Sequence, residues 1–145
     1  MTPDDRAARS AAVMWAQDAA SKWLGMELGE VCEGAATLTL TVAPHHCNGH
    51  GICHGGIIFA LADSAFAFAC NSRNQSTVAQ QNQITYLAPG RLGETLTATA
   101  TETSLQGRTG LTDVTVTGEG GRVIARFRGL SRAIPGHLFD EGSTA

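Results

Sequence analysis

A single carboxylate lies inside an otherwise apolar segment of this 145-residue chain. Asp63 is the one charged residue within residues 55–69, and no other Asp, Glu, Lys or Arg occurs within residues 35–71. Burying a carboxylate is costly unless another group compensates it. A glycine-rich polar stretch, residues 48–56, precedes this segment and overlaps its first two residues. The combination of flexible backbone, polar groups and one buried acid predicts an active site.

The start of the apolar segment could bind an oxyanion. If a helix begins there, the amides of Gly55, Gly56 and Ile57 have no partner within the helix and lie at the positive end of its dipole. Glycines have no side chain, so a substrate oxygen can approach closely. A preorganised N–H donor of this kind is worth about 3–4 kcal/mol of barrier in acyl transfer. The alternative is that both glycines only shape the first turn of the helix.

Asp63 is the candidate base or nucleophile, since an apolar setting raises the pKa of an Asp from about 3.9 toward a useful range. It could instead be a structural acid that bonds a neighbouring strand or a partner subunit. On one helix, Gly55 and Asp63 lie about 12 Å apart, and His54 and Asp63 point about 180° away from each other. One helix therefore cannot bring both groups to one carbonyl. This geometry predicts an obligate dimer in which a second subunit supplies Asp63.

Other polar residues near this segment have alternative structural roles. His54 and Asn48 could hold a thioester carbonyl or orient water, or they could serve only as a cap and a turn residue. The His/Cys-rich stretch 45–54 matches no spacing typical of a zinc site. Three arginines are candidates for contacts with phosphates, although solvated strand faces are the alternative: Arg108, Arg126 and Arg128.

The composition restricts the class of protein. A net charge of -3 gives no support for nucleic-acid binding, which usually shows as a basic patch. The charged fraction of 16% is low and favours a homo-oligomer. The first ten residues lack the apolar core of a signal peptide, and no apolar stretch is long enough to span a bilayer. Four cysteines without paired spacing indicate free thiols. We therefore expect a cytoplasmic protein without a membrane or nucleic-acid partner.

The elements that position these residues follow one another in a simple order. An alanine-rich helix is expected at about 4–24, two strands within 26–42, and a helix at about 54–70 that is apolar on every side and so enclosed by other structure. Four strands follow, at 77–87, 95–104, 111–117 and 123–134, and their short glycine-rich connections favour antiparallel pairing. The pattern predicts one α+β domain over residues 1–145, with a core at about 26–134 and a loose tail at 136–145.

The spacing Asn48-x5-His54-Gly55-Gly56-x6-Asp63, followed by an apolar stretch to residue 71, resembles the hotdog-fold acyl-CoA thioesterases. Within them it is most similar to the phenylacetic acid degradation (PaaI-type) branch. Segments 84–90, 93–96 and 127–129 fit the same family. The resemblance covers roughly residues 20–134.

The resemblance implies an antiparallel sheet wrapped around a long central helix, dimers that pair into tetramers, and hydrolysis of acyl-CoA at sites shared between subunits. The Gly55 amide would bind the thioester oxygen, and Asp63 of the opposite subunit would attack directly or activate water. His54 and Asn48 would position the carbonyl and the water. The expected substrates are aryl-acyl-CoA esters such as phenylacetyl-CoA, with CoA as part of the substrate and no metal or redox cofactor. Residues 80–83, Gln-Gln-Asn-Gln, match no pattern of the family.

Two other interpretations stay open. A hotdog acyl-thioester dehydratase or hydratase also pairs His with an acid across subunits, but the glycine-rich loop around His54 offers backbone donors more than a free imidazole base. A non-catalytic module could bind acyl-CoA or a metal through the His/Cys loop.

Overall fold

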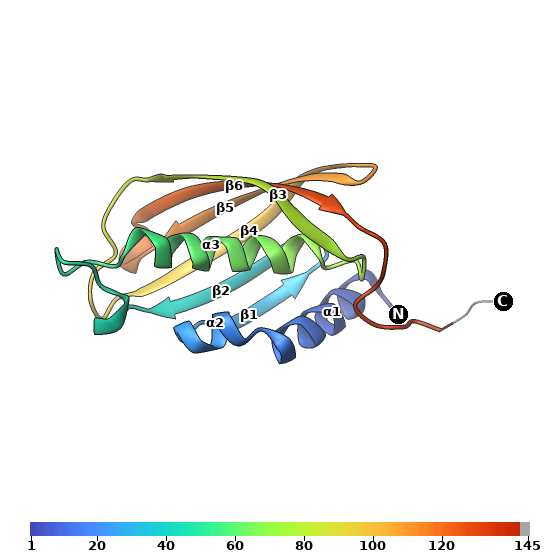
Figure 1. Cartoon of the computed structure of the whole chain (residues 1–145), viewed down its shortest axis with the longest axis horizontal. Helices are drawn as coiled ribbons and strands as arrows, with labels where there is room; N and C mark the ends of the chain where they lie inside the picture. Colours follow the sequence, from blue (N-terminus) through green and yellow to red (C-terminus); the bar gives the residue numbers. More distant parts are fainter. Residues whose placement is uncertain (143–145) are drawn as a thin grey trace.

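A long helix packs against one curved antiparallel sheet in the computed structural model, which describes residues 1–142 (Figure 1). The strand order is β1-β2-β4-β5-β6-β3, so β1 and β3 form the two edges. The strands are β1 (Glu27–Cys32), β2 (Ala35–Thr41), β3 (Thr77–Tyr86), β4 (Thr95–Gln106), β5 (Thr109–Thr117) and β6 (Val123–Ala133). Two short 3-10 turns, η1 (Pro44–His46) and η2 (Glu119–Gly121), lie in the connections.

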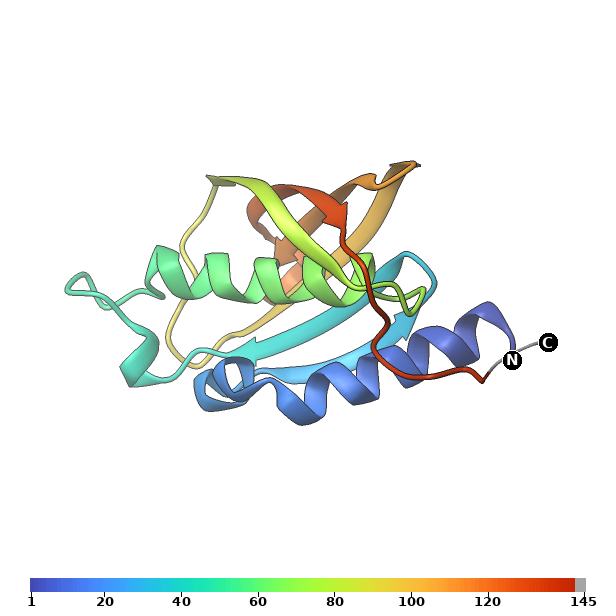
Figure 2. The same cartoon turned by 45° about the vertical axis from the view of Figure 1, so that its right-hand side comes forward.

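The central helix, α3 (Gly55–Cys70), lies in the hollow of the sheet, which curves around it (Figure 2). It begins after His54 and ends at Asn71, as the apolar run and the polar residues after it predict. The Asn71 side chain donates to the Ala67 carbonyl at 2.9 Å and accepts from the Thr77 amide at 2.9 Å. One side chain thus ends the helix and fixes the start of β3.

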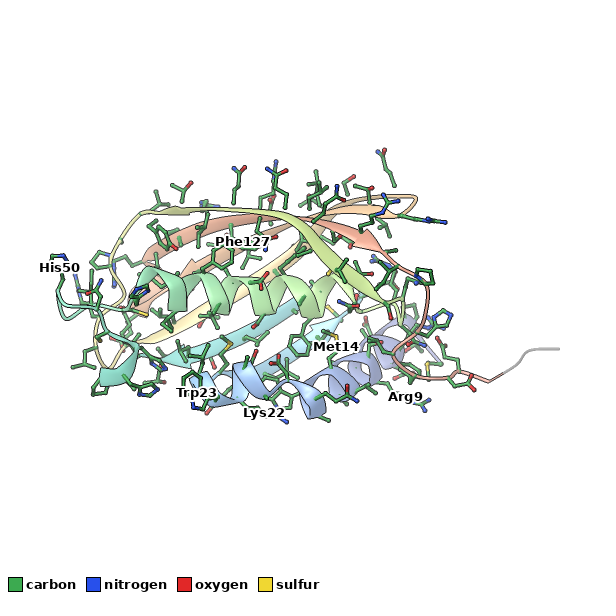
Figure 3. The ribbon with its side chains drawn as sticks, viewed as in Figure 1. Arg9, Met14, Lys22, Trp23, His50 and Phe127 are labelled. Atoms are coloured by element: carbon green, nitrogen blue, oxygen red, sulfur yellow. The ribbon has the colours of Figure 1, made fainter. Side chains whose placement is uncertain are left out.

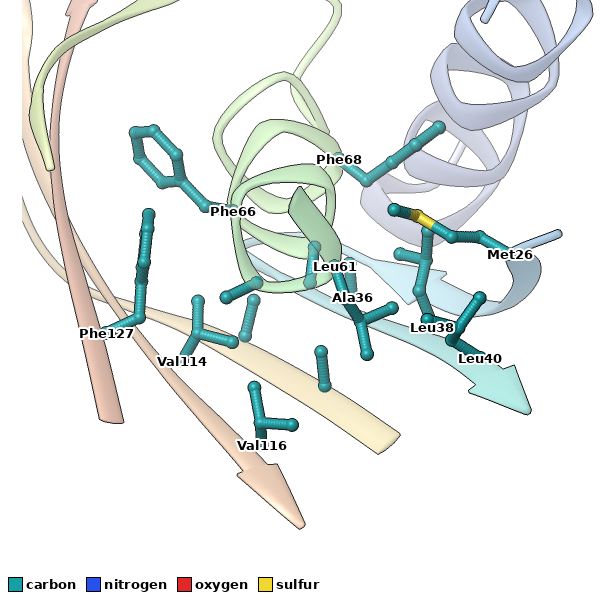
Figure 4. Packing of buried hydrophobic residues seen from close by; sticks show 14 of the residues in the cluster. Met26, Ala36, Leu38, Leu40, Leu61, Phe66, Phe68, Val114, Val116 and Phe127 are labelled. Atoms are coloured by element: carbon teal, nitrogen blue, oxygen red, sulfur yellow. The ribbon is translucent and has the colours of Figure 1, made fainter. Parts of the chain in front are cut away.

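The large side chains of α3 fill the core on both sides of the helix (Figure 4). Phe66 packs on Phe127 of β6, with ring centroids 5.8 Å apart, and Phe68 packs on Trp15 at 6.1 Å. A side chain at Gly129 would lie 2.6 Å from the Phe66 ring, so only glycine fits there. This close packing fixes α3 against β6.

The N-terminal segment forms two helices, α1 (Pro3–Gln17) and α2 (Ala19–Leu24), so the expectation of one continuous helix over 4–24 is wrong at Asp18. The Asp18 carboxylate accepts hydrogen bonds from the Ser21 amide at 2.9 Å and the Ser21 hydroxyl at 2.7 Å. Asp18 thus caps the start of α2, and the residue at an N-cap has a non-helical backbone, so α1 cannot continue through it. The Ser21 and Ser64 hydroxyls lie 2.9 Å apart and join α2 to α3.

The expectation of a loose tail is also wrong for residues 136–142, which cross beside α1 (Figure 2). The side-chain oxygen of the buried Asn74 accepts from the amides of Leu138 and Phe139 at 2.8 and 3.0 Å. Glu141 pairs with Arg6 of α1 at 3.0 Å. The rest of the predicted tail, residues 143–145, lies outside the described residues. None of the helices described here is long and apolar enough to cross a membrane.

Candidate active site

The start of α3 leaves one amide free. Nδ1 of His54 accepts from the Gly56 amide at 2.8 Å, and the His54 carbonyl accepts from the Ile57 amide at 2.9 Å. Within residues 1–142 the Gly55 amide has no hydrogen-bond partner. Of the three amides expected to point outward unpaired, only that of Gly55 remains available to a ligand. The Gly56 amide, expected to contact substrate, is occupied by His54.

The hydrogen bond to Gly56 also fixes which nitrogen of His54 carries the proton. A neutral imidazole has one donor and one acceptor nitrogen. Because Nδ1 accepts, Nε2 carries the hydrogen, and the exposed ring can donate a hydrogen bond but has no free lone pair. His54 is thus suited to bind a carbonyl oxygen and unsuited to act as a base while it caps the helix.

Asp63 is partly buried on the side of α3 that faces β3. Burial raises its pKa above 3.8, and a hydrogen bond from Asn82 acts in the opposite direction. In that bond Nδ2 of Asn82 donates to Oδ1 of Asp63 at 2.9 Å. A carboxylate with a raised pKa is a stronger base than an ordinary Asp.

Strand β3 contacts α3 both at Gly55 and at Asp63. The Tyr86 hydroxyl donates to the Gly55 carbonyl at 2.8 Å, and a side chain at Gly55 would lie 3.2 Å from the Tyr86 ring. Asn82 and Tyr86 are four residues apart on β3, about 13 Å. That matches the rise of about 12 Å from Gly55 to Asp63 along α3. Sequence reasoning missed both β3 residues, although this match of spacings was available as a signal.

The polar loop before α3 is held by hydrogen bonds within itself and to the β3–β4 connection. The Asn48 side-chain oxygen accepts from the His50 amide at 3.0 Å, and the Cys53 amide donates to the Gly90 carbonyl at 2.8 Å. His50 projects from the far end of the loop (Figure 3). Asn48 therefore shapes a turn here, and its role in positioning carbonyl or water stays a prediction.

The three candidate arginines do not gather at Gly55 within one chain. Arg126 and Arg128 alternate on β6 with residues that face α3, so they point away from it. Arg128 forms two hydrogen bonds with Asp113, at 2.7 and 3.0 Å. Arg108 lies in the β4–β5 turn, beside a cavity of about 200 Å³ that Cys70 also lines at the opposite end of α3. Their contacts with phosphates stay predictions.

The His/Cys-rich loop does not converge on one point. Within the described residues, no three His, Cys, Asp or Glu side chains are grouped so that they could hold a metal ion. His46 is buried and turned inward, where its ring bonds the Ala43 amide at 2.9 Å and the Leu24 carbonyl at 2.6 Å. Cys32, Cys47, Cys53 and Cys70 are free thiols.

Comparison with known proteins identifies the class that this helix, sheet and site define. The model of the thioesterase superfamily matches residues 50–125, which include α3 and the glycine-rich start of the site. The chain belongs to the thioesterase superfamily. The predicted hotdog fold and the predicted enzyme class, a thioester hydrolase, are confirmed.

Among its relatives is the acyl-coenzyme A thioesterase PaaI of Escherichia coli strain K12. The two are 41% identical over 136 residues, which cover 94% of this chain and 97% of that protein. The structure of the E. coli PaaI protein, from the phenylacetic acid degradation operon, superposes with a TM-score of 0.92 at 40% identity, covering 94% of this chain and 99% of that one. The predicted resemblance to the PaaI-type branch is confirmed.

Two more distant relatives show how widely the similarity extends. Human acyl-coenzyme A thioesterase 13 is 34% identical over 99 residues, which cover 66% of this chain and 70% of that protein. The structure of smu.793 from Streptococcus mutans UA159, bound to acetyl CoA, has a TM-score of 0.75 at 26% identity and covers 78% of this chain and 91% of that one.

Proposed function

We propose that this enzyme hydrolyses aryl-acyl-CoA thioesters, such as phenylacetyl-CoA or hydroxyphenylacetyl-CoA, to the free acid and CoA. The similarity to a thioesterase encoded in a phenylacetic acid degradation operon supports the aryl-acetyl group. A relative with acetyl CoA bound supports CoA as the carrier. The reaction needs no resident metal or redox cofactor, because water, an acid–base group and an oxyanion donor are sufficient.

The free Gly55 amide is the observation that carries this proposal. It and the Nε2–H group of His54 donate to the thioester oxygen and stabilise the negative charge that develops on it. Asp63 takes a proton from water as the water oxygen bonds to the carbonyl carbon. The carbon–sulfur bond then breaks, and the proton passes from Asp63 to the thiolate of CoA.

The catalytic groups must come from two chains. Gly55 and Asp63 lie eight residues apart on α3, a rise of about 12 Å. A second α3, antiparallel and related by a two-fold axis near residues 59 and 60, brings Gly55 to Asp63 of the partner subunit. The residues of α3 that remain at least partly exposed in one chain include a row of mostly small side chains, which permits close approach: Gly56, Ala60, Asp63, Ser64 and Ala67.

The neighbouring edge of the sheet offers a surface for the same partner. β3 has β6 on one side only, so its other edge has unpaired backbone groups. Val78, Tyr86 and Leu87, in or just after β3, are 45–58% exposed. We therefore propose a homodimer with two shared sites and the pairing of such dimers into a homotetramer. The free thiols and the CoA substrate support a cytoplasmic location.

The alternative of a dehydratase or hydratase is less well supported. That chemistry needs an imidazole lone pair to remove a proton, whereas Nδ1 of His54 is occupied by the Gly56 amide. A non-catalytic metal-binding module is likewise less well supported, because His46 faces the interior.

Thiol release from a panel of CoA esters tests the proposal. The panel contains phenylacetyl-, hydroxyphenylacetyl-, benzoyl-, short-chain and long-chain acyl-CoA, with 2-enoyl-CoA as the dehydratase control. We expect the highest kcat/KM for the aryl-acetyl esters. Preference for straight chains would refute the aryl-acetyl assignment, and loss of the enoyl chromophore without thiol release would favour the dehydratase.

A further inference from the structure

The polar run at residues 80–83 contains one side chain that reaches the site. β3 has a bulge between Ala79 and Gln81, and after it Asn82 pairs with Gly129 and Ile84 with Phe127. Gly129 and Phe127 face α3, so Asn82 and Ile84 do too, whereas the neighbouring Gln81 and Gln83 are exposed. The bulge thus turns one amide of the run toward the helix.

Among residues 1–142, the Asn82 side chain makes one hydrogen bond, and its partner is Asp63. Nδ2 donates to Oδ1 of Asp63 at 2.9 Å. The second oxygen of the carboxylate, Oδ2, has no hydrogen-bond partner within residues 1–142. The side-chain oxygen of Asn82 is buried and has no partner in the same part of the chain.

The unpaired oxygen indicates that packing alone does not explain this residue. A buried acceptor without a donor is destabilising, and an apolar side chain of similar volume would avoid that cost. The amide cannot rotate by a half-turn to relieve it, because its oxygen would then face the carboxylate. The Asp63 carboxylate therefore sets the orientation of the amide, and the amide in turn sets the orientation of the carboxylate.

We propose that Asn82 is the positioning residue of Asp63, holding Oδ1 against β3 so that Oδ2 is the oxygen that takes the proton from water. This inference rests on the proposed function, in which Asp63 is the base. During hydrolysis the water proton moves to Oδ2, the water oxygen bonds to the carbonyl carbon, and Oδ2 later returns that proton to the departing thiolate. Oδ1 stays bonded to Asn82 throughout.

Within residues 1–142, the ionisable groups on α3 and on the elements packed against it make no hydrogen bond to Asp63, so Asn82 is its direct polar contact. On α3, the Cys70 thiol is buried, which raises its pKa to about 12 and keeps it neutral. Asp18, before α2, reaches α3 only through the hydroxyls of Ser21 and Ser64. On β4, Glu102 is paired with Arg73.

The test compares variants at Asn82 with a matched variant on the opposite face of the same strand. Asn82→Leu keeps the branched side-chain skeleton and removes the donor, Asn82→Asp keeps the shape and places a second carboxylate beside Asp63, and Gln83→Leu is the control. Two quantities are measured: the pH dependence of kcat on phenylacetyl-CoA, and the pKa of Asp63 itself by carboxyl carbon-13 NMR, with Asp63→Asn used to assign the signal.

A donor to the ionised carboxylate lowers its pKa, so its loss raises that pKa. We expect the acid limb of kcat and the NMR titration of Asp63 to move up by about 1 pH unit in Asn82→Leu, a loss of about tenfold in kcat on that limb. In Asn82→Asp we expect a larger upward shift of both the acid limb of kcat and the NMR titration of Asp63. In Gln83→Leu neither should shift. KM should change little in all three variants.

Two outcomes separate this inference from the proposed function. If Asp63→Asn is inactive and both Asn82 variants keep the wild-type titration of Asp63, the positioning role is refuted and the proposed function stands. If Asp63→Asn retains full activity, the catalytic role of Asp63 is wrong, and the positioning role falls with it. The NMR titration needs no turnover, so an inactive Asn82 variant still gives an answer.

Discussion

Nδ1 of His54 lies 2.8 Å from the Gly56 amide, and this contact determines which groups at the start of α3 can bind a substrate. It removes the Gly56 amide and the imidazole lone pair from the site. It leaves the Gly55 amide and the Nε2–H group of His54 as the candidate donors to a ligand. In the proposed function both donate to the thioester oxygen, so His54 would cap the helix and bind the oxyanion as well.

Substitutions of His54 should separate these two roles. Asn is a good N-cap, so His54→Asn should unfold at the same urea concentration as wild type, whereas His54→Ala loses about 0.5–2 kcal/mol. Both lose the Nε2–H donor, and kcat should fall about 10²-fold in each. Urea unfolding and thiol release on the same samples check this. Full activity in His54→Asn would show that the ring does not contact the substrate.

Asp63→Asn should abolish turnover without harming the fold. Loss of a general base lowers the rate by about 10²–10⁴-fold. Because burial raises the folded-state pKa of Asp63 above 3.8, wild type loses stability as the pH rises through the range just above that value. The variant has no charge to bury, so at pH 7 it should be at least as stable as wild type. Urea unfolding at pH 4 and pH 7, at equal protein concentration, tests this. A variant clearly less stable at pH 7 would contradict it.

The proposed dimer contact should be sensitive to a larger side chain at Ala60. This residue lies next to the expected two-fold axis on the partly exposed side of α3. Ala60→Trp should separate the chains into species of 15.1 kDa and abolish activity, because each site then lacks half of its groups. Ala12→Trp, on the exposed side of α1, is the control. Sedimentation measures the mass of each variant, and thiol release measures its activity. An active dimer of Ala60→Trp would show that the contact between subunits lies elsewhere.

Glu94 should govern stability in acid. Its buried carboxylate accepts from the amides of Arg91 and Glu119 at 2.9 Å each and from the Arg122 guanidinium at 2.9 Å. The Arg122 hydrogen bonds, with help from the amides, lower its pKa from 4.5 to about 2. The stabilisation is therefore fully present above pH 4.5 and disappears as the pH falls to about 2.

Glu94→Gln should cost about 1–3 kcal/mol at pH 7 and much less near pH 2. Urea unfolding of wild type, this variant and the exposed Glu30→Gln control across that range checks the difference. A cost that does not change with pH would show that the lost packing, and not the charge, is responsible.

The fold was largely predictable because its signals are local. The apolar run of α3, the alternation in β2 and the glycine turns between strands each lie within a short window. The break at Asp18 was also local, since an Asp three residues before Ser21 is a capping pattern, but the alanine-rich composition obscured it. The ordered tail was not predictable, because Asn74 bonds residues 64 and 65 positions away.

The site was predictable on α3 but not on β3. A regular helix fixes the directions of Gly55 and Asp63 from their numbers alone. On β3, the alternation places Asn82 on the same face as Ile84 and Tyr86, but which residue of that face meets Asp63 depends on the pairing of β3 with β6. No short window of sequence contains that pairing.

Activity in mixed dimers tests the shared site most directly. Asp63→Asn and His54→Asn chains, each reduced in kcat by about 10²-fold or more when alone, are refolded together in equal amounts, and mixed dimers are verified by native mass spectrometry. Random pairing makes half of the dimers mixed, each with one intact site, so about a quarter of wild-type activity should return. Verified mixed dimers without any activity would show that Gly55, His54 and Asp63 do not form one site across two chains.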